Sequence, residues 1–294
     1  MGATREVSAE TRPVVILGHT GFVGRGLFQR YASSGTALTG YSSATLDLRD
    51  AAALAALDEA VSPETLLYVA AALTPDRGAT LDVLSSNFTM LVNLGRYLER
   101  HPVYKCVYIS SDAVYPMGSQ AVTENSAVEP SNFYALAKYT GERILQSVAD
   151  KSGFPLLIVR PTAIYGPGDT HNSYGPNRFI RSIVAEQSVR LFGGGEENRD
   201  HLYIDDLLEI LVGLSASDYV GVFNAATGNS RSFGSIVEDL QPLVPTDFEV
   251  VNLPRQSAVT HRHFDIRRLT DALPGLTFTP FEDGLQRTLS AALA

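Results

Sequence analysis

The fold of this chain is indicated first by one segment, Pro13-Val14-Val15-Ile16-Leu17-Gly18-His19-Thr20-Gly21-Phe22-Val23-Gly24. Its first five residues are apolar, as in a strand buried on both faces of a parallel sheet. Glycines at every third position then permit a tight turn, a close backbone approach to a ligand and close packing of a helix against a strand. Strand, glycine turn and helix in this order predict a pyrophosphate site at the N-terminus of a helix.

Alternating strands and helices continue this pattern through the first half of the chain. We expect strands at residues 36–41, 65–72, 105–109 and 155–161, and helices at 24–35, 51–60, 80–100 and 133–152. This alternation predicts an α/β fold with a Rossmann-like, doubly wound parallel sheet. Residues 13–164 are therefore expected to form an NAD(P)-binding domain, preceded by a flexible segment at residues 1–12.

After Tyr165 the chain becomes richer in loops. Polar, glycine-rich segments at 165–177 and 193–200 predict loops. Around them we expect strands at 189–192, 222–225 and 248–251, a short helix from Arg178, and helices at 204–216 and 282–292. We interpret residues 165–201 and 227–294 as a smaller, interleaved C-terminal substrate lobe, with returns to the sheet from about residue 202 to 226.

Composition excludes several classes of function. The 23 basic and 32 acidic residues give a net charge of −9, which disfavours binding to nucleic acid or to an anionic membrane. No apolar run approaches the length of about 18 residues that a transmembrane helix needs, and residues 1–12 lack the apolar core of a signal peptide. We therefore expect a cytoplasmic protein, in which the single Cys106 is a small core residue.

Three residues could carry acid/base chemistry. Ser111 follows the buried strand at 105–109, at the carboxyl end where open α/β sheets bind ligands. Tyr134 and Lys138 are four residues apart and share one face of the helix at 133–152. An ammonium beside a phenol favours the phenolate, and a serine hydroxyl can hold a substrate oxygen while its proton moves. The alternative is a polar strand end followed by an ordinary amphipathic helix.

The second expected strand suggests which dinucleotide is bound. Ser42, and not Asp or Glu, follows Tyr41, so the usual partner of a ribose 2′-hydroxyl is missing. Arg25, Arg49 and the hydroxyls of Ser42 and Ser43 could accommodate a 2′-phosphate, which favours NADP over NAD. The small residues 70–72 at the next strand end leave room for a cofactor. Asn87 is expected to hydrogen-bond a neighbouring backbone, and the alternative is a partly exposed structural Asn.

Together these residues resemble the NAD(P)-dependent epimerase/dehydratase family of nucleotide-sugar enzymes, within the extended short-chain dehydrogenases/reductases. The similarity runs almost end to end. The matching motifs are Gly18-x-x-Gly21-x-x-Gly24, Asp47-Leu48, Asn87, Ser110-Ser111-x-x-Val114-Tyr115, Glu124, Tyr134-x-x-x-Lys138, Arg160-Pro161, Tyr165-Gly166-Pro167-Gly168, Arg199-Asp200-His201-Leu202-Tyr203-Ile204-Asp205-Asp206 and Phe223-Asn224.

The resemblance implies a role for each matched position. Tyr134 would be the catalytic acid/base, Lys138 would bind the nicotinamide ribose, and Ser111 would orient the substrate hydroxyl. The implied cofactor contacts are Gly18, Thr20, Gly21, Phe22, Val23, Gly24, Ser42, Asp47, Leu48, Ala70, Ala71, Ala72, Asn87, Tyr134, Lys138 and Pro161. The implied substrate contacts are Ser111, Asp112, Ala113, Tyr134, Asn177, Arg199 and Arg262. No metal site is expected, and the resemblance implies a homodimer formed by the helices at 80–100 and 133–152.

At some positions this sequence differs from particular members of the family, and these differences disfavour some of the family's reactions. The 4,6-dehydratases place Glu where Ala113 stands, so no evident base removes a C5 proton. Enzymes resembling GDP-fucose synthase use a Cys near Ala113 and a His near Asn177, and both are absent. A C4 epimerase acting through a 4-keto intermediate is favoured, with an NADP-dependent 4-ketoreductase as the alternative. For Arg262, a solvated surface cation is the alternative to a diphosphate contact; for the whole chain, the alternative is a cofactor-binding sensor or scaffold without catalysis.

Overall fold

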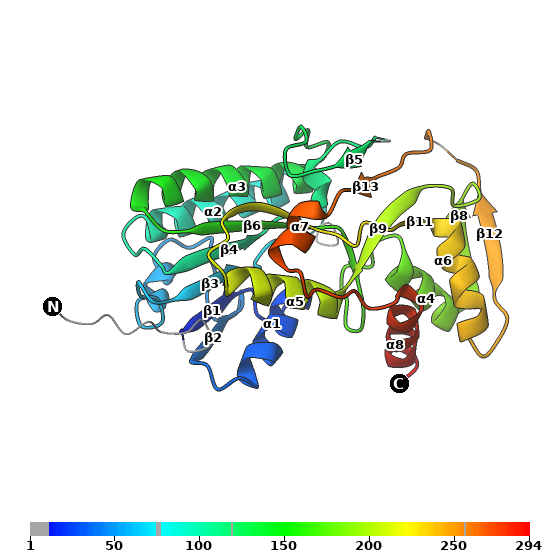
Figure 1. The fold of residues 1–294 in the computed structure, drawn as a ribbon, viewed down its shortest axis with the longest axis horizontal. Coiled ribbons are helices and arrows are strands. Elements are labelled where there is room, and N and C mark those ends of the chain that lie inside the picture. The colour runs from blue at the N-terminus through cyan, green and yellow to red at the C-terminus, as the bar shows by residue number, and fades with distance from the viewer. Residues whose placement is uncertain (1–11, 75–77, 119, 256) are drawn as a thin grey trace. The chain divides into compact units, whose positions relative to one another are not determined.

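The computed structural model describes residues 12–74, 78–118, 120–255 and 257–294 (Figure 1). The chain divides into two compact units. The first unit runs to Val114 and resumes over Pro130–Arg160 and Ile210–Phe223. The second unit comprises Tyr115–Glu129, Pro161–Glu209 and Asn224–Ala294. The predicted flexible segment at 1–12 lies, except for Arg12, outside the described residues.

A six-stranded sheet confirms the predicted α/β fold. Its order is β10-β6-β4-β3-β1-β2, and the pairs from β6 to β2 are all parallel. The strands are β1 (Val14–Leu17), β2 (Leu38–Tyr41), β3 (Leu66–Val69), β4 (Lys105–Ile109), β6 (Leu156–Pro161) and β10 (Gly221–Ala225). Every residue of β1, β3, β4 and β6 is buried, which explains why these segments read as continuous apolar runs.

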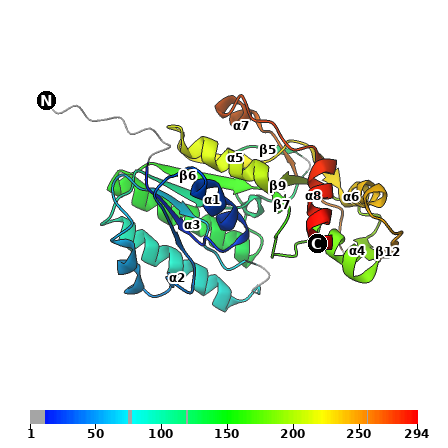
Figure 2. The ribbon, with the colours of Figure 1, turned by 90° about the horizontal axis from the view of Figure 1, so that it is seen from below.

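Helices cover both faces of this sheet. In Figures 1 and 2, α2 (Leu81–Leu98) and α3 (Phe133–Ser152) lie side by side on one face, and α1 (Phe22–Ala32) lies on the other. Gly95 of α2 allows the close approach, because a Cβ there would lie 3.3 Å from Ile144 and Val148 of α3. On the opposite face, the Tyr68 hydroxyl lies 2.7 Å from that of Tyr31 on α1.

Local capping signals set the bounds of the two long helices. The side chain of Thr80 accepts a hydrogen bond from the Val83 amide, and that of Asn132 accepts one from the Ala135 amide. Gly153 ends α3 in the left-handed conformation, at φ 76°. The helix predicted at 133–152 is therefore confirmed, and the one predicted at 80–100 is shorter by two residues at its C-terminal end.

Two predicted elements of the first unit are wrong in detail. The helix expected at 51–60 is only a 3₁₀ helix, η2 (Ala53–Leu57), although Asp50 does accept a hydrogen bond from the Ala52 amide. The strand expected at 65–72 ends at Val69. Residues 70–72 therefore follow the strand instead of continuing it.

The second unit is built from small sheets. One has the order β11-β9-β7, formed by Ser230–Ser232, Asn198–Tyr203 and Ala163–Tyr165. A second pairs β8 (Ser188–Phe192) with β12 (Glu249–Leu253), and a third pairs β5 (Ala121–Val122) with β13 (His263–Phe264). The helices are α4 (Pro176–Glu186), α5 (Ile204–Ser215, which continues into the first unit), α6 (Phe233–Leu240), α7 (Arg267–Ala272) and α8 (Phe281–Leu293).

These sheets change three predictions. The loop expected at 193–200 ends at Glu197, and β9 begins at Asn198, so Arg199 lies in a strand. The short helix expected from Arg178 begins at Pro176 and includes Asn177. Residues 115–129, assigned from sequence to the Rossmann domain, belong to the second unit because β5 pairs with β13. None of the helices in the described residues is long and apolar enough to cross a membrane.

Candidate active site

Lys138 is buried on α3 at only 5% exposure. Its Nζ donates a hydrogen bond to the Ile109 carbonyl, at 2.7 Å, and lies 5.9 Å from the centre of the Tyr134 ring. Burial lowers the pKa of Lys138 to about 8, while the Glu142 carboxylate acts in the opposite direction. The helix spacing predicted from the sequence therefore places the Lys138 ammonium near the Tyr134 ring.

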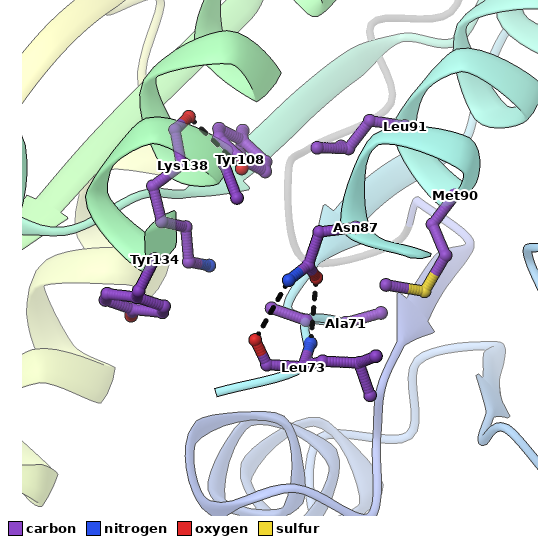
Figure 3. A pocket seen from close by; sticks show the side chains of 10 residues that line it. Ala71, Leu73, Asn87, Met90, Leu91, Tyr108, Tyr134 and Lys138 are labelled. Carbon is purple, nitrogen blue, oxygen red and sulfur yellow. Dashed lines mark hydrogen bonds between the residues drawn. The ribbon is translucent and has the colours of Figure 1, made fainter. Parts of the chain in front are cut away.

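A pocket adjoins this pair (Figure 3). Its lining comes from α2, α3, β4 and the segment after β3: Ala71, Ala72, Leu73, Asn87, Met90, Leu91, Tyr108, Tyr134, Ala137 and Lys138. Figure 3 shows Tyr134 and Lys138 on one wall and Asn87 with Leu73 on the other. An apolar pocket with a few convergent polar groups is the usual form of a ligand site.

Asn87 fixes the segment that follows β3. Its Oδ1 accepts a hydrogen bond from the Leu73 amide at 2.9 Å, and its Nδ2 donates to the Leu73 carbonyl at 3.0 Å. The predicted bond from Asn87 to a neighbouring backbone is confirmed. Because Asn87 is 4% exposed, it is a buried clamp and not a partly exposed helix residue.

Ser111 lies directly after β4, as predicted. Its Oγ accepts a hydrogen bond from the Ala113 amide at 3.1 Å and is 3.4 Å from Asp112 Oδ1. The short helix η4 (Asp112–Val114) packs against α3. Ser111 directly precedes η4 and so lies next to the helix that carries Tyr134 and Lys138. Among the described residues, Ser111 is not part of the pocket lining.

Packing within the protein requires two of the three glycines in the turn, Gly18 and Gly24, but not Gly21. A Cβ at Gly18 would lie 2.7 Å from the Ala71 amide nitrogen, and one at Gly24 would lie 2.1 Å from the Gly18 carbonyl oxygen. Gly21 is exposed at the N-cap of α1, and a Cβ there would meet only the Gly18 oxygen, at 3.4 Å. Packing within the protein therefore does not require Gly21. An exposed helix N-terminus without an acidic first turn fits a dinucleotide pyrophosphate.

The turn after β2 is held by a local ion pair. Arg49 contacts both carboxylate oxygens of Asp47, with NH2 to Oδ2 at 2.7 Å, and lowers the pKa of Asp47 to about 2. Asn93 of α2 donates to the Leu48 and Arg49 carbonyls, so this turn is anchored to α2. Arg49, predicted as one of several groups for a 2′-phosphate, is thus already engaged by Asp47.

Within the second unit, the predicted phosphate-binding arginines meet at Asn198. The guanidinium of Arg199 donates to the Asn198 and Thr260 carbonyls at 2.8 and 2.6 Å, and the Arg262 amide donates to the same Asn198 carbonyl at 3.1 Å. Arg262 is 5% exposed, and its guanidinium donates to the Tyr115 carbonyl at 2.7 Å. The alternative reading of Arg262 as a solvated surface cation is wrong.

Other motif residues of the second unit bond to the protein itself. Asn177 accepts from the Gly166 amide at 3.2 Å. Tyr115 donates to Asn224 at 2.8 Å, and Glu124 accepts from the Asn224 amide at 2.9 Å. The architecture of the second unit therefore explains the motif matches at Tyr115, Glu124 and Asn224.

Sequence reasoning missed several pocket residues, namely Leu73, Met90, Leu91, Tyr108 and Ala137. Leu73 extends the predicted run 70–72 by one residue, and Ala137 precedes Lys138, so local signals existed for both. Met90 and Leu91 follow Asn87 by one helical turn. Tyr108 gave no such signal because its position depends on the packing of α3 against β4.

The chain belongs to the NAD dependent epimerase/dehydratase family, whose model matches residues 14–226. It is therefore an enzyme of this family, with NAD or NADP as its cofactor. A curated relative, an uncharacterized UDP-glucose epimerase of Bacillus subtilis (strain 168), is 24% identical over 159 residues. That match spans 52% of this chain and about half, 50%, of the relative's own length.

Solved structures share the fold over nearly the whole chain. The UDP-N-acetylglucosamine 4-epimerase from Methanobrevibacter ruminantium M1 has a TM-score of 0.87 at 22% identity, covering 96% of this chain and 98% of its own. The structure of RMD from Pseudomonas aeruginosa, complexed with NADPH, has a TM-score of 0.85 at 22% identity, covering 96% and 99%. At 22% identity, these two structures show that the chain shares their fold.

Proposed function

We propose that the protein is an NAD(P)-dependent nucleotide-sugar epimerase that inverts C4 through a 4-keto intermediate. The observation that carries the proposal is the buried Lys138 ammonium beside Tyr134 on one wall of the pocket. Oxidation of an alcohol needs a base for the hydroxyl proton while hydride leaves the carbon. A phenol next to an ammonium suits this step because the positive charge favours the phenolate.

Each catalytic residue has a defined task in this proposal. Tyr134 takes the proton from the C4 hydroxyl and returns it after the sugar has presented its other face. Lys138 keeps positive charge near the phenolate, and Ser111 holds the substrate oxygen while the proton moves. When bound, the nicotinamide supplies the acceptor and donor of hydride.

Ala113 supports epimerisation over dehydration. It occupies the place where resembling 4,6-dehydratases carry Glu, and an alanine methyl group cannot remove a C5 proton. For the nucleotide we propose contacts from Asn177, Arg199 and Arg262. Guanidinium groups suit a diphosphate since they bind bidentately and stay charged. UDP-sugar epimerases among the similar proteins support a nucleotide sugar as the substrate.

The test is the Tyr134→Phe variant, assayed by NMR for C4 inversion of UDP-, GDP-, dTDP- and CDP-hexoses. We expect turnover to fall by about 10²–10⁴-fold, while dinucleotide binding persists. Tyr139→Phe, on the same helix, is the matched control and should retain full turnover. Undiminished biological activity of Tyr134→Phe would favour a cofactor-binding sensor over an enzyme.

A 4-ketoreductase is the second candidate, and Ser42 at the end of β2 favours it. Without an acidic residue there, a 2′-phosphate is not repelled, so we propose a preference for NADP. Fluorescence titration with NADH and NADPH measures this preference. A released cofactor consumed mole for mole with a 4-keto sugar would identify the reductase, whereas a retained cofactor and inverted C4 would identify the epimerase.

We also propose a homodimer formed through α2 and α3. Phe133 and Leu136 of α3 are large apolar side chains that are 38% and 37% exposed, and a partner helix would remove them from water. Light scattering after size-exclusion chromatography should give twice the monomer mass. Phe133→Ser with Leu136→Ser should lower it.

A further inference from the structure

Glu142 is a buried carboxylate that the proposed mechanism does not use. It follows Lys138 by one helical turn and Tyr134 by two, so the three side chains share one face of α3. Glu142 is 2% exposed. A carboxylate removed from water in this way is costly unless charged and hydrogen-bonding partners surround it.

Two neighbouring strands supply those partners. Arg160 of β6 binds Glu142 through two bonds, Nε to Oε1 at 2.8 Å and NH2 to Oε2 at 2.5 Å. The hydroxyl of Ser110, directly after β4, donates to Oε1 at 2.5 Å. Arg160 and Ser110 are 4% and 2% exposed. The carboxylate on α3 is therefore held in one orientation by Arg160 of β6 and by Ser110, which follows β4.

The electrostatic effect of Glu142 reaches the pocket wall. Lys138 is surrounded by the Ile109 carbonyl, the Tyr108 ring of β4 and the Tyr134 ring of α3, with the neutral Asn87 on the α2 wall. Burial disfavours its ammonium, and Glu142 is the anion that favours it. Glu142 also contributes to the raised pKa of Tyr108, after burial and Tyr134.

A purely structural ion pair is the competing explanation. Arg160 neutralises part of the Glu142 charge, and a buried pair can simply tie a helix to a sheet. The spacing of Tyr134, Lys138 and Glu142 along one helix face favours a link to the reacting groups. The two explanations predict different behaviour for the Lys138 proton.

We propose that Glu142, clamped by Arg160 and Ser110, is a positioning residue that keeps Lys138 protonated beside Tyr134 during turnover. This inference rests on the proposed function, in which Tyr134 is the acid/base. Glu142 acts through Lys138 and does not touch the substrate.

The test titrates Lys138 directly. The sequence contains three lysines, Lys105, Lys138 and Lys151, so ¹³C-lysine NMR gives few signals, and Lys138→Met identifies the relevant one. In Glu142→Gln, which removes the charge at similar volume, the Lys138 midpoint should fall by about one pH unit or more. The pH at which kcat declines on the alkaline side should fall by the same amount as the Lys138 midpoint, and KM should change less.

Glu99→Gln is the matched control. Glu99 carries an exposed pair with Lys151 of α3, at 2.9 Å, and its loss should leave the Lys138 midpoint unchanged. If Glu142→Gln does not fold, the double variant Glu142→Leu/Arg160→Met replaces the pair with apolar side chains, an exchange that is often neutral for stability. It should show the same fall in the Lys138 midpoint.

An unchanged Lys138 midpoint in a folded variant lacking Glu142 would overturn the inference and leave the structural ion pair. That result is separable from failure of the proposed function. If Tyr134→Phe abolishes turnover while Glu142→Gln leaves the Lys138 titration unaltered, only the role of Glu142 is lost. If Tyr134→Phe retains turnover, the acid/base assignment itself fails.

Discussion

Motif side chains in the two units have different partners. In the first unit, Tyr134, Lys138 and Asn87 line a pocket. In the second unit, Asp200 accepts hydrogen bonds from other residues of that unit: from Thr162 Oγ1 at 3.2 Å, and from the Thr227 amide and hydroxyl at 2.9 and 3.0 Å. Equally recognisable motifs therefore line a pocket in one region and bind the protein's own residues in another. Only their partners separate the two roles.

The largest effect is expected from Lys138→Met. Turnover should fall by about 10²–10⁴-fold, because the phenol loses the charge that favours its ionised form. The melting temperature should stay the same or rise, since a buried ammonium is replaced by an apolar side chain of similar length. Calorimetry and an NMR turnover assay on one preparation measure both. A large loss of stability would place Lys138 with the architectural residues, contrary to the contrast drawn between the two units.

Asp200→Ala should show the opposite behaviour. Removal of the carboxylate leaves the Thr227 amide and two threonine hydroxyls without their acceptor, which should lower the free energy of unfolding by about 2–3 kcal/mol. Urea denaturation measures this change. Asp205→Ala is the control within the same motif, because Asp205 is exposed, and it should change stability by less than about 0.5 kcal/mol. Equal losses in the two variants would refute the structural role.

His201 tests the second unit through pH. It is buried between the rings of Phe233 and Phe281, and burial, with smaller effects from Arg199 and Arg231, lowers its pKa to about 3. Between about pH 3 and pH 6.5, the folded state therefore binds no proton at His201. The unfolded state, in which the pKa of histidine is about 6.5, binds one in this range. Stability from this group is present above pH 6.5 or so and is lost as pH falls towards the folded pKa.

His201→Phe should remove that pH dependence. Between pH 7 and pH 5, the wild-type protein should lose about 2 kcal/mol more unfolding free energy than the variant. Urea denaturation at the two pH values measures the difference, and other groups cancel because both proteins share them. Identical pH dependence of the wild-type protein and the variant would mean that the pKa of His201 is the same in the folded and the unfolded state.

Gly21→Ala should have the smallest effect, and it tests whether a glycine of the first unit serves ligand binding instead of packing. Its φ of −73° is open to alanine, and the new Cβ has ordinary space, so stability should hardly change. The methyl group would obstruct approach of a pyrophosphate, and the affinity for NADH and NADPH should fall by about tenfold. Unchanged affinity for both would remove the glycine turn from the cofactor site.

The sequence could predict the elements of the first unit because their signals are local. Buried strands read as apolar runs, and α3 matches its predicted bounds because Asn132 caps one end and Gly153 ends the other. The spacing of Tyr134 and Lys138 likewise follows from one helix. The helix expected at 51–60 is wrong, because only a 3₁₀ helix forms there, with Leu54 and Leu57 as its buried residues.

The sequence alone determined the alternation of strands and long helices in the first unit, the glycine turn and the pairing of a phenol with an ammonium, all of which depend on neighbours within a few residues. Tertiary structure alone decided that Arg262 is buried, that two-residue strands such as β5 and β13 pair, and that Arg160 grips Glu142 across 18 residues of chain. These outcomes depend on contacts between distant segments, and a charged or short polar stretch carries no local sign of which distant segment will cover it.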